Sequence, residues 1–385
     1  MAHWDQQLEA IKQQHSYRVR RCMSGPQASQ VTLDGNTYHN FCSNDYLGLA
    51  HHAKVRKAAK QAIDEFGCGS GASQHINGYS RVHKECEQQL ADFLQVEKVV
   101  LFGSGYLANL GVLSSLSKRH DCIFGDKLNH ASLIDAAQSS TADFKRYRHA
   151  DTDHLGNLLT ECHYQQGLVV TDGVFSMQGS SAPMSALIQQ CRKHDAMLIV
   201  DDAHGIGVLG EHGRGSLEAQ NIASHQVDVL IGTFGKSFGS GGAFVAGETA
   251  LIEYLIQKAR SMIYTTALAP SLAAAATASL QIICAEPERR MRLHENIQYF
   301  KQAIANSPLN LQPSDSAIQS IILGSNEKTL AASQALETQG CLVVAIRPPT
   351  VPKNTARLRI TLSSEHQVHQ IDHLVSVLMD IDHAF

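Results

Sequence analysis

Lys236 is the residue of this sequence whose surroundings point most clearly to chemistry. It lies in VLIGTFGKSFGSGGAFVAG (residues 229–247), where glycines separate two apolar runs. Lysine is rarely placed beside a buried strand for packing alone, and a partly desolvated lysine is a nucleophile toward carbonyl groups. Glycines also let the backbone come close to a ligand. We therefore expect Lys236 to bind an aldehyde covalently; the alternative is a surface lysine on a flexible hairpin.

A second apolar run leads into a glycine-rich turn at residues 103–108, within VVLFGSGYLAN. A turn of this kind that opens a helix presents backbone N–H groups and a helix N-terminus to an anion. The same turn fits the pattern G-x-G-x-x-A, and Asp126 follows at about the spacing of dinucleotide-binding folds. A Rossmann NAD-dependent dehydrogenase is therefore the rival interpretation, and a tight turn without a ligand is a third.

Two further apolar runs end in polar residues. MLIVDDAHGIGVLG (197–210) reaches Asp201, and a buried carboxylate needs a partner such as a protonated ring nitrogen, unless it caps the following turn. TDGVFSMQGSSAPM (171–184) leads to Ser176, whose hydroxyl could contact a ring substituent. Ligands of open α/β sheets bind beyond the carboxyl ends of the strands, so these groups are expected at one edge.

One ligand explains all of these strand ends. Pyridoxal 5'-phosphate carries a phosphate for the turn at 103–108, a pyridine nitrogen for Asp201 and an aldehyde for Lys236. A dinucleotide explains only the glycine-rich turn and leaves Lys236 and Asp201 without a role. The sequence therefore favours pyridoxal phosphate as the cofactor.

The elements that must position these groups alternate between short apolar runs and helical patterns. The apolar runs are VVLF (99–102), CIFG (122–125), GLVVTD (167–172), MLIVDD (197–202), VLIGTF (229–234) and GAFVAG (242–247). Runs this short and apolar suit strands that are buried on both faces, so we expect an α/β fold with a mostly parallel sheet. We predict three parts: an N-terminal helix and extended segment (1–45), a large cofactor-binding domain (46–280) and a smaller C-terminal α+β domain (281–385).

Composition narrows the class of protein. The net charge of -4 over 385 residues gives no electrostatic case for nucleic acid or for an anionic membrane surface. No apolar stretch approaches the roughly 18 residues of a membrane span, and the N-terminus lacks the apolar core of a signal peptide. Nine scattered cysteines without C-x-x-C, and no H-E-x-x-H, indicate neither a disulfide framework nor a metal site. We expect a cytoplasmic protein.

The order of these motifs resembles the α-oxoamine synthases, which are fold-type I pyridoxal-phosphate enzymes. The matching segments are NFCSNDYLGL, GSGASQHINGY, LFGSGYLAN, DKLNHASLIDA, TDGVFSMQG, VDDAHGIGVLG, GTFGKSFGSGG, IYTTALAP and RPPTVPKNTARLRITL. They extend from about residue 15 to 365, nearly the whole chain. The resemblance implies a large domain with a mostly parallel sheet and a smaller C-terminal domain.

The resemblance also implies catalytic and cofactor-binding roles. Lys236 would hold the cofactor as a Schiff base, Asp201 would keep the ring nitrogen protonated, and His130 would stack on the ring face. These three are the expected catalytic residues. The other expected cofactor contacts are Gly105, Tyr106, Ser176, His204 and Thr233, with Thr265 or Thr266 reaching the phosphate of the neighbouring subunit of a homodimer.

The expected substrate contacts follow from the same resemblance. Arg347 would bind the amino-acid carboxylate in bidentate geometry, with Asn44 beside it. Arg18, Thr350 and His130 match further substrate-contacting positions. The sequence departs from the family pattern at Tyr106, Ser237 and Ala269, none of which removes a reacting group.

Within the family, SQHINGYSRVH and TVPKNTARLRITL are most similar to the branch that serves biotin biosynthesis. That branch condenses L-alanine with a pimeloyl thioester, carried on coenzyme A or acyl carrier protein, and releases carbon dioxide and the thiol. The alternatives within the family are 2-amino-3-ketobutyrate ligase and serine palmitoyltransferase. The resemblance therefore implies an acyltransferase that acts as a homodimer.

Overall fold

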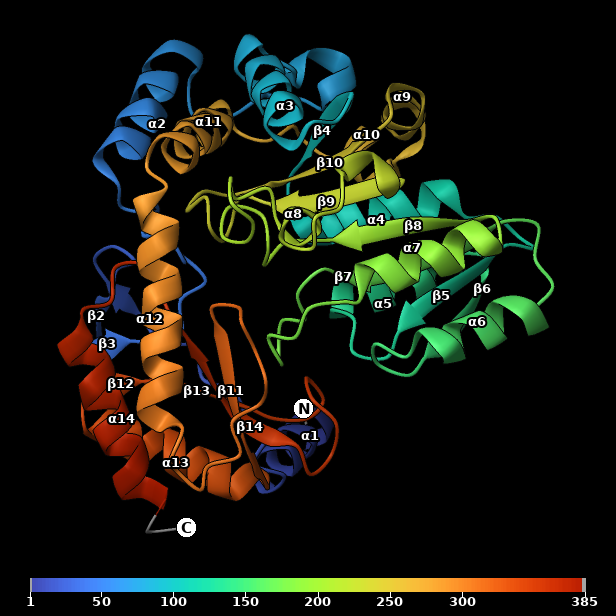
Figure 1. Cartoon of the computed structure of the whole chain (residues 1–385). Helices are drawn as coiled ribbons and strands as arrows, with labels where there is room; N and C mark the ends of the chain where they lie inside the picture. The colour runs from blue at the N-terminus through green and yellow to red at the C-terminus, as the bar shows by residue number, and fades with distance from the viewer. Residues whose placement is uncertain (1, 383–385) are drawn as a thin grey trace. The chain divides into compact units, whose positions relative to one another are not determined.

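The apolar runs of the middle of the chain form one seven-stranded sheet, coloured from cyan to yellow in Figure 1. The structure, a computed structural model, describes residues 2–382. The strand order is β4-β10-β9-β8-β7-β5-β6, and only β10 is antiparallel to its neighbours. The strands are β4 Lys98–Phe102, β5 Cys122–Asp126, β6 Asp143–Tyr147, β7 Gly167–Asp172, β8 Ala196–Asp201, β9 Val229–Thr233 and β10 Ala243–Gly247.

All six predicted strands are present, and the predicted mostly parallel α/β sheet is confirmed. The strand that the sequence did not reveal is β6, whose residues DFKRY are mostly polar. It lies at the edge of the sheet, and of its side chains only that of Tyr147 is buried. A mostly exposed edge strand lacks the apolar run by which the other strands were predicted.

The helices of this unit supply the crossovers and the cover of the sheet. One face is buried by side chains of α4, α5, α9 and α10, which form one core with the strands. The helices are α2 Ala53–Phe66, the π-helix η1 Gln74–Gly78, α3 Arg81–Leu94, α4 Gly105–Leu116, α5 Ala131–Ser139, α6 Thr152–Glu161, α7 Met184–Lys193, α8 Ser216–Ala219, the 3-10 helix η2 Ser224–Gln226, α9 Thr249–Lys258, α10 Arg260–Ile263 and α11 Pro270–Ala285. The sequence pattern at 250–280 predicts a long helix broken at Thr265–Pro270; this break separates α10 from α11, and a second break at Ala259 separates α9 from α10.

A second unit carries two small sheets. One has the order β1-β2-β3-β12 and the other β11-β14-β13. Its strands are β1 Met23–Ser24, β2 Gln30–Leu33, β3 Asn36–Asn40, β11 Ile318–Gly324, β12 Cys341–Leu342, β13 Val344–Ile346 and β14 Ala356–Thr361. Its helices are α1 Ala2–Gln13, α13 Asn326–Thr338, α14 Val368–Asp382 and most of α12 Glu288–Ile304.

The division of the chain differs from the three predicted parts. One unit comprises residues 1–48, 177–180 and 291–385, and the other comprises 49–176 and 181–290. The N-terminal segment therefore belongs to the unit of the C-terminal residues, because β3 pairs in parallel with β12. The predicted boundary at 280 falls inside α11, about ten residues before Arg290.

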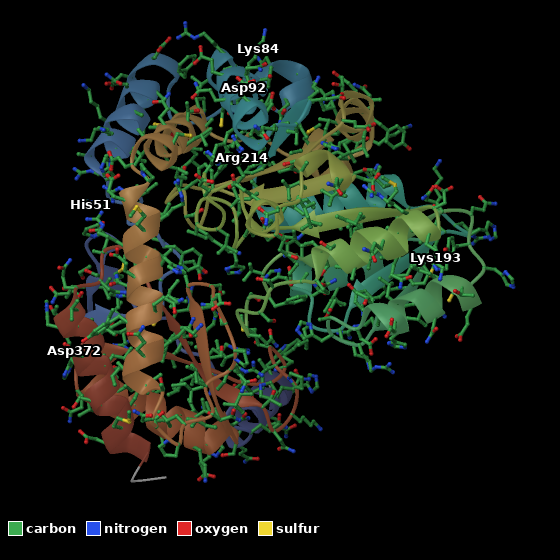
Figure 2. All side chains as sticks on the ribbon, viewed as in Figure 1. His51, Lys84, Asp92, Lys193, Arg214 and Asp372 are labelled. Carbon is green, nitrogen blue, oxygen red and sulfur yellow. The ribbon has the colours of Figure 1, made fainter. Side chains whose placement is uncertain are left out.

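Charged side chains of both signs cover the outer helices. Lys84 and Asp92 of α3 and Lys193 of α7 are exposed, and Figure 2 labels them. Within residues 2–382, no helix is long and apolar enough to cross a membrane.

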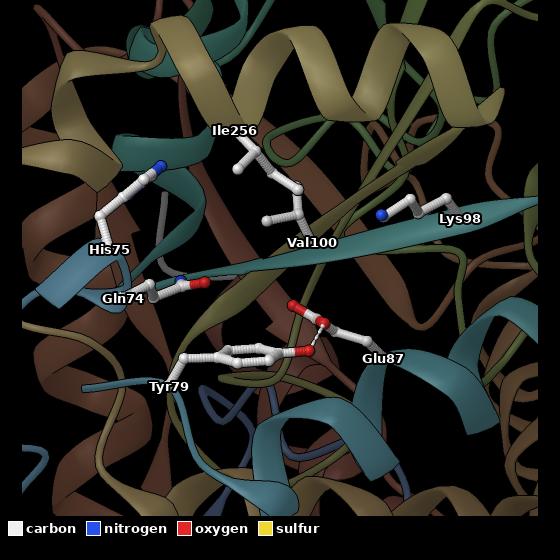
Figure 3. Close-up of a pocket in the computed structure, with 7 residues that line it drawn as sticks. All are labelled: Gln74, His75, Tyr79, Glu87, Lys98, Val100 and Ile256. Atoms are coloured by element: carbon white, nitrogen blue, oxygen red, sulfur yellow. Dashed lines mark hydrogen bonds between the residues drawn. The ribbon is translucent and has the colours of Figure 1, made fainter. Parts of the chain in front are cut away.

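Side chains cover the free edge of β4. Glu87 Oε1 accepts a hydrogen bond from Leu101 N at 3.2 Å, and Gln74 Nε2 donates to Leu101 O at 2.9 Å. Tyr79 O–H donates to the other oxygen of Glu87 at 2.6 Å (Figure 3). These residues line a pocket together with Lys98. Satisfied backbone groups make an edge strand a poor template for pairing with another chain.

Candidate active site

Five parallel strands end at one edge of the large sheet. Beyond the carboxyl ends of β4, β5, β7, β8 and β9 lie the groups that the sequence predicted, because parallel strands bring their ends to a common edge. All of these groups belong to the unit of residues 49–176 and 181–290. The predicted cofactor-binding groups are therefore all within one unit.

The glycine-rich turn after β4 opens α4. Ser104 caps the helix by accepting a hydrogen bond from Leu107 N at 3.3 Å, and Gly105 is the first helical residue. The first-turn N–H groups of a 12-residue helix have no intrahelical partner and attract an anion. A Cβ on Gly105 would lie 4.0 Å from Thr233 Cβ, so the end of β9 lies beside this helix start.

Two predicted phosphate contacts already have internal partners. Thr233 Oγ1 donates to Gly242 O at 3.0 Å and accepts from Gly235 N at 3.2 Å. The Tyr106 hydroxyl donates to Asp135 at 2.9 Å, so the backbone N–H of Tyr106 is the group that faces an anion at the helix start. The structure places both residues at the turn, and their roles remain predictions.

Asp201 ends β8 and is buried. Asn109 Nδ2 donates to its Oδ2 at 2.7 Å, and Ala203 N donates to its Oδ1 at 3.1 Å. A carboxylate has about four acceptor positions, so these two bonds leave room for the N–H of a protonated ring. The geometry suits the predicted role.

His130 is the N-cap residue of α5. Its backbone N–H donates to Asp172 Oδ2 at 2.7 Å, and its Nδ1 lies 2.7 Å from Ser132 Oγ. Burial lowers the pKa of the imidazole, Asp201 opposes this change, and the positive charge of Lys236 adds to it. His130 is therefore favoured in its neutral form.

Lys236 lies in the loop between β9 and β10 and is half-buried. Buried Phe234 and Phe238 flank it, and Ser237 Oγ donates to Ile206 O at 2.6 Å, which anchors the loop. Its charge acts on His130 as well as on two carboxyl groups at the neighbouring strand ends, Asp172 and Asp202. The structure thus brings Lys236 and His130 together.

The sequence analysis missed the two carboxyl groups Asp172 and Asp202. Both are buried, and burial raises the pKa of Asp172 well above its usual range and that of Asp202 to about 7. The signal that could have found Asp172 is its place at the end of GLVVTD, a buried strand. Its contact with the backbone of His130 gives it a part in positioning that residue.

The remaining predicted cofactor contacts lie in the same unit. Ser176 and His204 are buried and follow β7 and β8 in the chain. Thr265 and Thr266 line a small pocket with Gly103 of their own chain. Thr265 is half-buried and Thr266 is exposed, and the phosphate contact of one or the other with the neighbouring subunit stays a prediction.

Apart from His130, the predicted substrate contacts lie in the other unit. Arg18 Nη2 donates a hydrogen bond to Thr350 Oγ1 at 3.4 Å. Burial lowers the pKa of Arg347, and the charge of Arg18 lowers it further. Arg347 Nη1 donates to His15 O at 2.6 Å. These groups form one cationic cluster.

Asn44 was expected beside Arg347; its side-chain oxygen accepts hydrogen bonds from the Tyr46 hydroxyl and from a different arginine. Arg359 Nη2 donates to Asn44 Oδ1 at 3.2 Å, and Arg359 is buried. Arg359 is on β14, within the matched segment RLRITL, and the sequence analysis did not single it out. Arg359 and Arg347 are therefore both candidates for a carboxylate.

The residues present fit pyridoxal phosphate. The N-terminus of α4 suits its phosphate, Asp201 suits its ring nitrogen and Lys236 suits its aldehyde, all in one unit. The ring would then lie where His130, itself linked to Asp201 by electrostatics, presents its imidazole. A dinucleotide would leave Asp201, Lys236 and His130 without a role.

Comparisons with known proteins show the family of the chain. A family model described as aminotransferase class I and II matches residues 36–378. The 8-amino-7-oxononanoate synthase of Methylococcus capsulatus is 49% identical over 97% of this chain and 96% of that protein. The protein of the same name from Hahella chejuensis is 49% identical over 98% of this chain and 95% of that protein.

Solved structures give the same fold. Serine palmitoyltransferase from S. paucimobilis, solved with a pyridoxal-phosphate adduct of myriocin, has a TM-score of 0.94 at 30% identity, over 99% of this chain and 97% of that one. The 8-amino-7-oxononanoate synthase of Francisella tularensis has a TM-score of 0.78 at 32% identity, over 90% of this chain and 98% of that one.

Proposed function

Because the chain belongs to the aminotransferase class I and II family, we propose that it condenses L-alanine with a pimeloyl thioester and releases carbon dioxide and the free thiol. The α-oxoamine synthase resemblance, the fold, the pyridoxal-phosphate cofactor and the acyltransferase function predicted from the sequence are confirmed. The observation that carries the choice of substrates is the near-full-length identity to several proteins named 8-amino-7-oxononanoate synthase.

The reaction forms a bond between Cα of L-alanine and the thioester carbonyl carbon. The C–S bond breaks, the thiol leaves with a proton, the alanine carboxyl group departs as carbon dioxide, and a proton takes its place on Cα. When bound, pyridoxal phosphate supplies an electron sink for the negative charge that develops at Cα. The protein has to hold this cofactor, orient L-alanine and move the Cα proton.

Three side chains divide this work. Lys236 Nζ would hold the cofactor through its aldehyde and would move the proton of Cα. Asp201 would accept a hydrogen bond from the protonated ring nitrogen and so keep the proton there. His130 covers the ring face. The amides at the start of α4 bind the phosphate.

Arginines of the other unit are candidates for the anion contacts. Arg359, which donates to Asn44, is our candidate for the α-carboxylate, because burial excludes water from its guanidinium. Arg18 and Arg347 then suit the second carboxylate of a pimeloyl chain. A palmitoyl chain ends in a methyl group and gives such a cationic cluster no partner.

Serine palmitoyltransferase is the second candidate, because its structures have the higher TM-scores. A TM-score compares backbones, whereas substrates are selected by side chains. The sequence identity is 30% to that enzyme and 49% to the Methylococcus relative, which favours the pimeloyl reaction.

The proposal is tested with the purified protein and pyridoxal phosphate. We expect a yellow protein that borohydride bleaches, with the pyridoxyl group found on Lys236 by peptide mass spectrometry. Thiol release should be fastest with L-alanine and pimeloyl-CoA, and absent in Lys236→Ala. The proposal fails if serine with palmitoyl-CoA, or glycine with acetyl-CoA, is the better pair. Pimeloyl-acyl carrier protein, assayed in parallel, identifies the carrier.

We further infer a homodimer in the cytoplasm. In the larger unit, Ile76 of η1 and Tyr264 after α10 are 77% and 71% exposed, and η1 packs against α10. Large exposed apolar side chains on adjoining elements are typical of a protein interface. All nine cysteines are free thiols, which supports a reducing compartment.

A further inference from the structure

A fully buried asparagine joins two of the expected catalytic groups. Asn109, on α4, donates one hydrogen bond to Asp201 Oδ2 at 2.7 Å and another to Ser132 Oγ at 2.8 Å. Ser132 Oγ in turn lies 2.7 Å from His130 Nδ1. The carboxylate of Asp201 and the imidazole of His130 are therefore the two ends of one hydrogen-bonded array.

The array has one consistent arrangement of hydrogens. Both oxygens of Asp201 accept hydrogen bonds, so the amide of Asn109 must turn its nitrogen toward the carboxylate, and both of its N–H groups are used. The amide oxygen of Asn109 is buried without a partner, so nothing on that side holds the amide. The two donated bonds alone fix its orientation.

The hydroxyl of Ser132 completes the assignment. It accepts from Asn109 and has one hydrogen left, and His130 Nδ1 is the acceptor within reach. The backbone N–H of Ser132 also points at Nδ1, at 3.3 Å. Two donors converge on this nitrogen, so it carries a lone pair and the ring proton resides on Nε2.

We propose that Asn109 and Ser132 are positioning residues that hold His130 as the Nε2–H tautomer and tie its orientation to Asp201. The proposal rests on the proposed function. An amide does not ionise, so the array transmits orientation and not protons. His130 then offers a hydrogen-bond donor to an oxygen of the substrate, and its Nδ1 is not available to take the Cα proton, which leaves that step to Lys236.

Neutron diffraction from perdeuterated crystals of the purified enzyme tests the tautomer directly. We expect a deuteron on His130 Nε2 and none on Nδ1, and deuterons of Asn109 Nδ2 directed at Asp201 and Ser132. A deuteron on Nδ1 in an enzyme that turns over L-alanine overturns the array alone. An Nε2 deuteron in an enzyme that fails with pimeloyl-CoA overturns the proposed function and leaves the array standing.

Variants test the consequence. In Ser132→Ala we expect kcat per bound cofactor to fall about tenfold, the cost of one such hydrogen bond, while KM for L-alanine changes little. Ser132→Thr keeps the hydroxyl and should restore kcat. The control is Ser114→Ala, which removes an exposed hydroxyl from α4.

Asn109→Ala removes both bonds and should change the absorption spectrum of the bound cofactor as well as kcat. Because Asn109 is fully buried, the melting temperature of the Asn109→Ala variant is measured beside its kcat. If Asn109→Ala does not fold, Ser132→Ala alone tests the proposal. The proposal is wrong if Ser132→Ala lowers the melting temperature but leaves kcat and the cofactor spectrum of the folded enzyme unchanged.

Discussion

At the scale of single residues, two arginines of the smaller unit are candidates for two different carboxylates of the reactants. Arg359 is buried against Asn44, whereas Arg347 lies near Arg18. In the proposed reaction, L-alanine brings one carboxylate and the pimeloyl chain brings another. Substitution of each arginine should therefore affect a different substrate.

We predict that Arg359→Ala raises KM for L-alanine by about tenfold to hundredfold, the cost of a lost charge-assisted hydrogen bond. Arg347→Ala should instead raise KM for pimeloyl-CoA. Steady-state kinetics with each substrate varied in turn makes the comparison, and Arg292→Ala, an exposed arginine of α12, is the control. If Arg347→Ala raises KM for L-alanine more than Arg359→Ala does, Arg347 binds the α-carboxylate, as expected from the sequence.

Residues whose role shows in a local sequence segment could be predicted from the sequence. Residues whose role depends on a contact with a distant segment could not. Lys236, Asp201 and His130 each stand in a recognisable segment at a strand end. Asn109 was passed over within LFGSGYLAN because its partner Asp201 is 92 residues away. Arg359 and Asn44 are 315 residues apart. Such contacts follow from the fold and leave no local pattern.

At the scale of elements, α3 and the edge strand β4 share a titratable contact. Glu87 of α3 accepts the backbone N–H of Leu101 and the hydroxyl of Tyr79. Burial raises the pKa of Glu87 to about 7, although both of these hydrogen bonds and nearby Lys98 act against the rise. Lys98 itself forms an ion pair with Glu253.

The pH dependence of stability follows from the sign of this shift. A carboxyl group with a higher pKa in the folded chain binds more protons when folded, so its contribution to stability falls as pH rises between the two pKa values. For Glu87 this window extends from the ordinary 4.5 to about 7. We predict that the melting temperature of Glu87→Gln falls less than that of the wild type across this window.

Thermal melting of the two proteins at several pH values measures the difference. Glu85→Gln is the matched control, because Glu85 is an exposed glutamate of the same helix whose nearest ion pair is with Arg81. Parallel curves for the wild type and Glu87→Gln would contradict the prediction. Asp202 and Asp172 also have raised pKa values, but they are common to all three proteins and cancel.

At the scale of the whole molecule, the pattern of apolar runs predicts an α/β chain but not which distant segments fold together. Residues 1–48 and 291–385 form one unit because β3 lies beside β12 and the turn at 177–180 bonds Ser320 and Arg357. Each of these contacts joins segments more than 100 residues apart in the sequence. The predicted boundary at 280 followed a change in composition, and pairing across the chain determines the unit.

The predicted dimer can be tested by mixing two inactive chains. If Thr265 and Thr266 bind the phosphate of the neighbouring subunit, a heterodimer of Lys236→Ala and a Thr265→Ala, Thr266→Ala double variant has one intact site, built from the lysine of one chain and the threonines of the other. Random reassociation of equal amounts should restore about a quarter of wild-type activity, because half of the dimers are mixed and each has one intact site of two. Light scattering establishes that dimers form, and each variant mixed with itself is the control. If the threonines serve their own chain, neither site of the mixed dimer is intact, and no activity returns beyond that of the two variants.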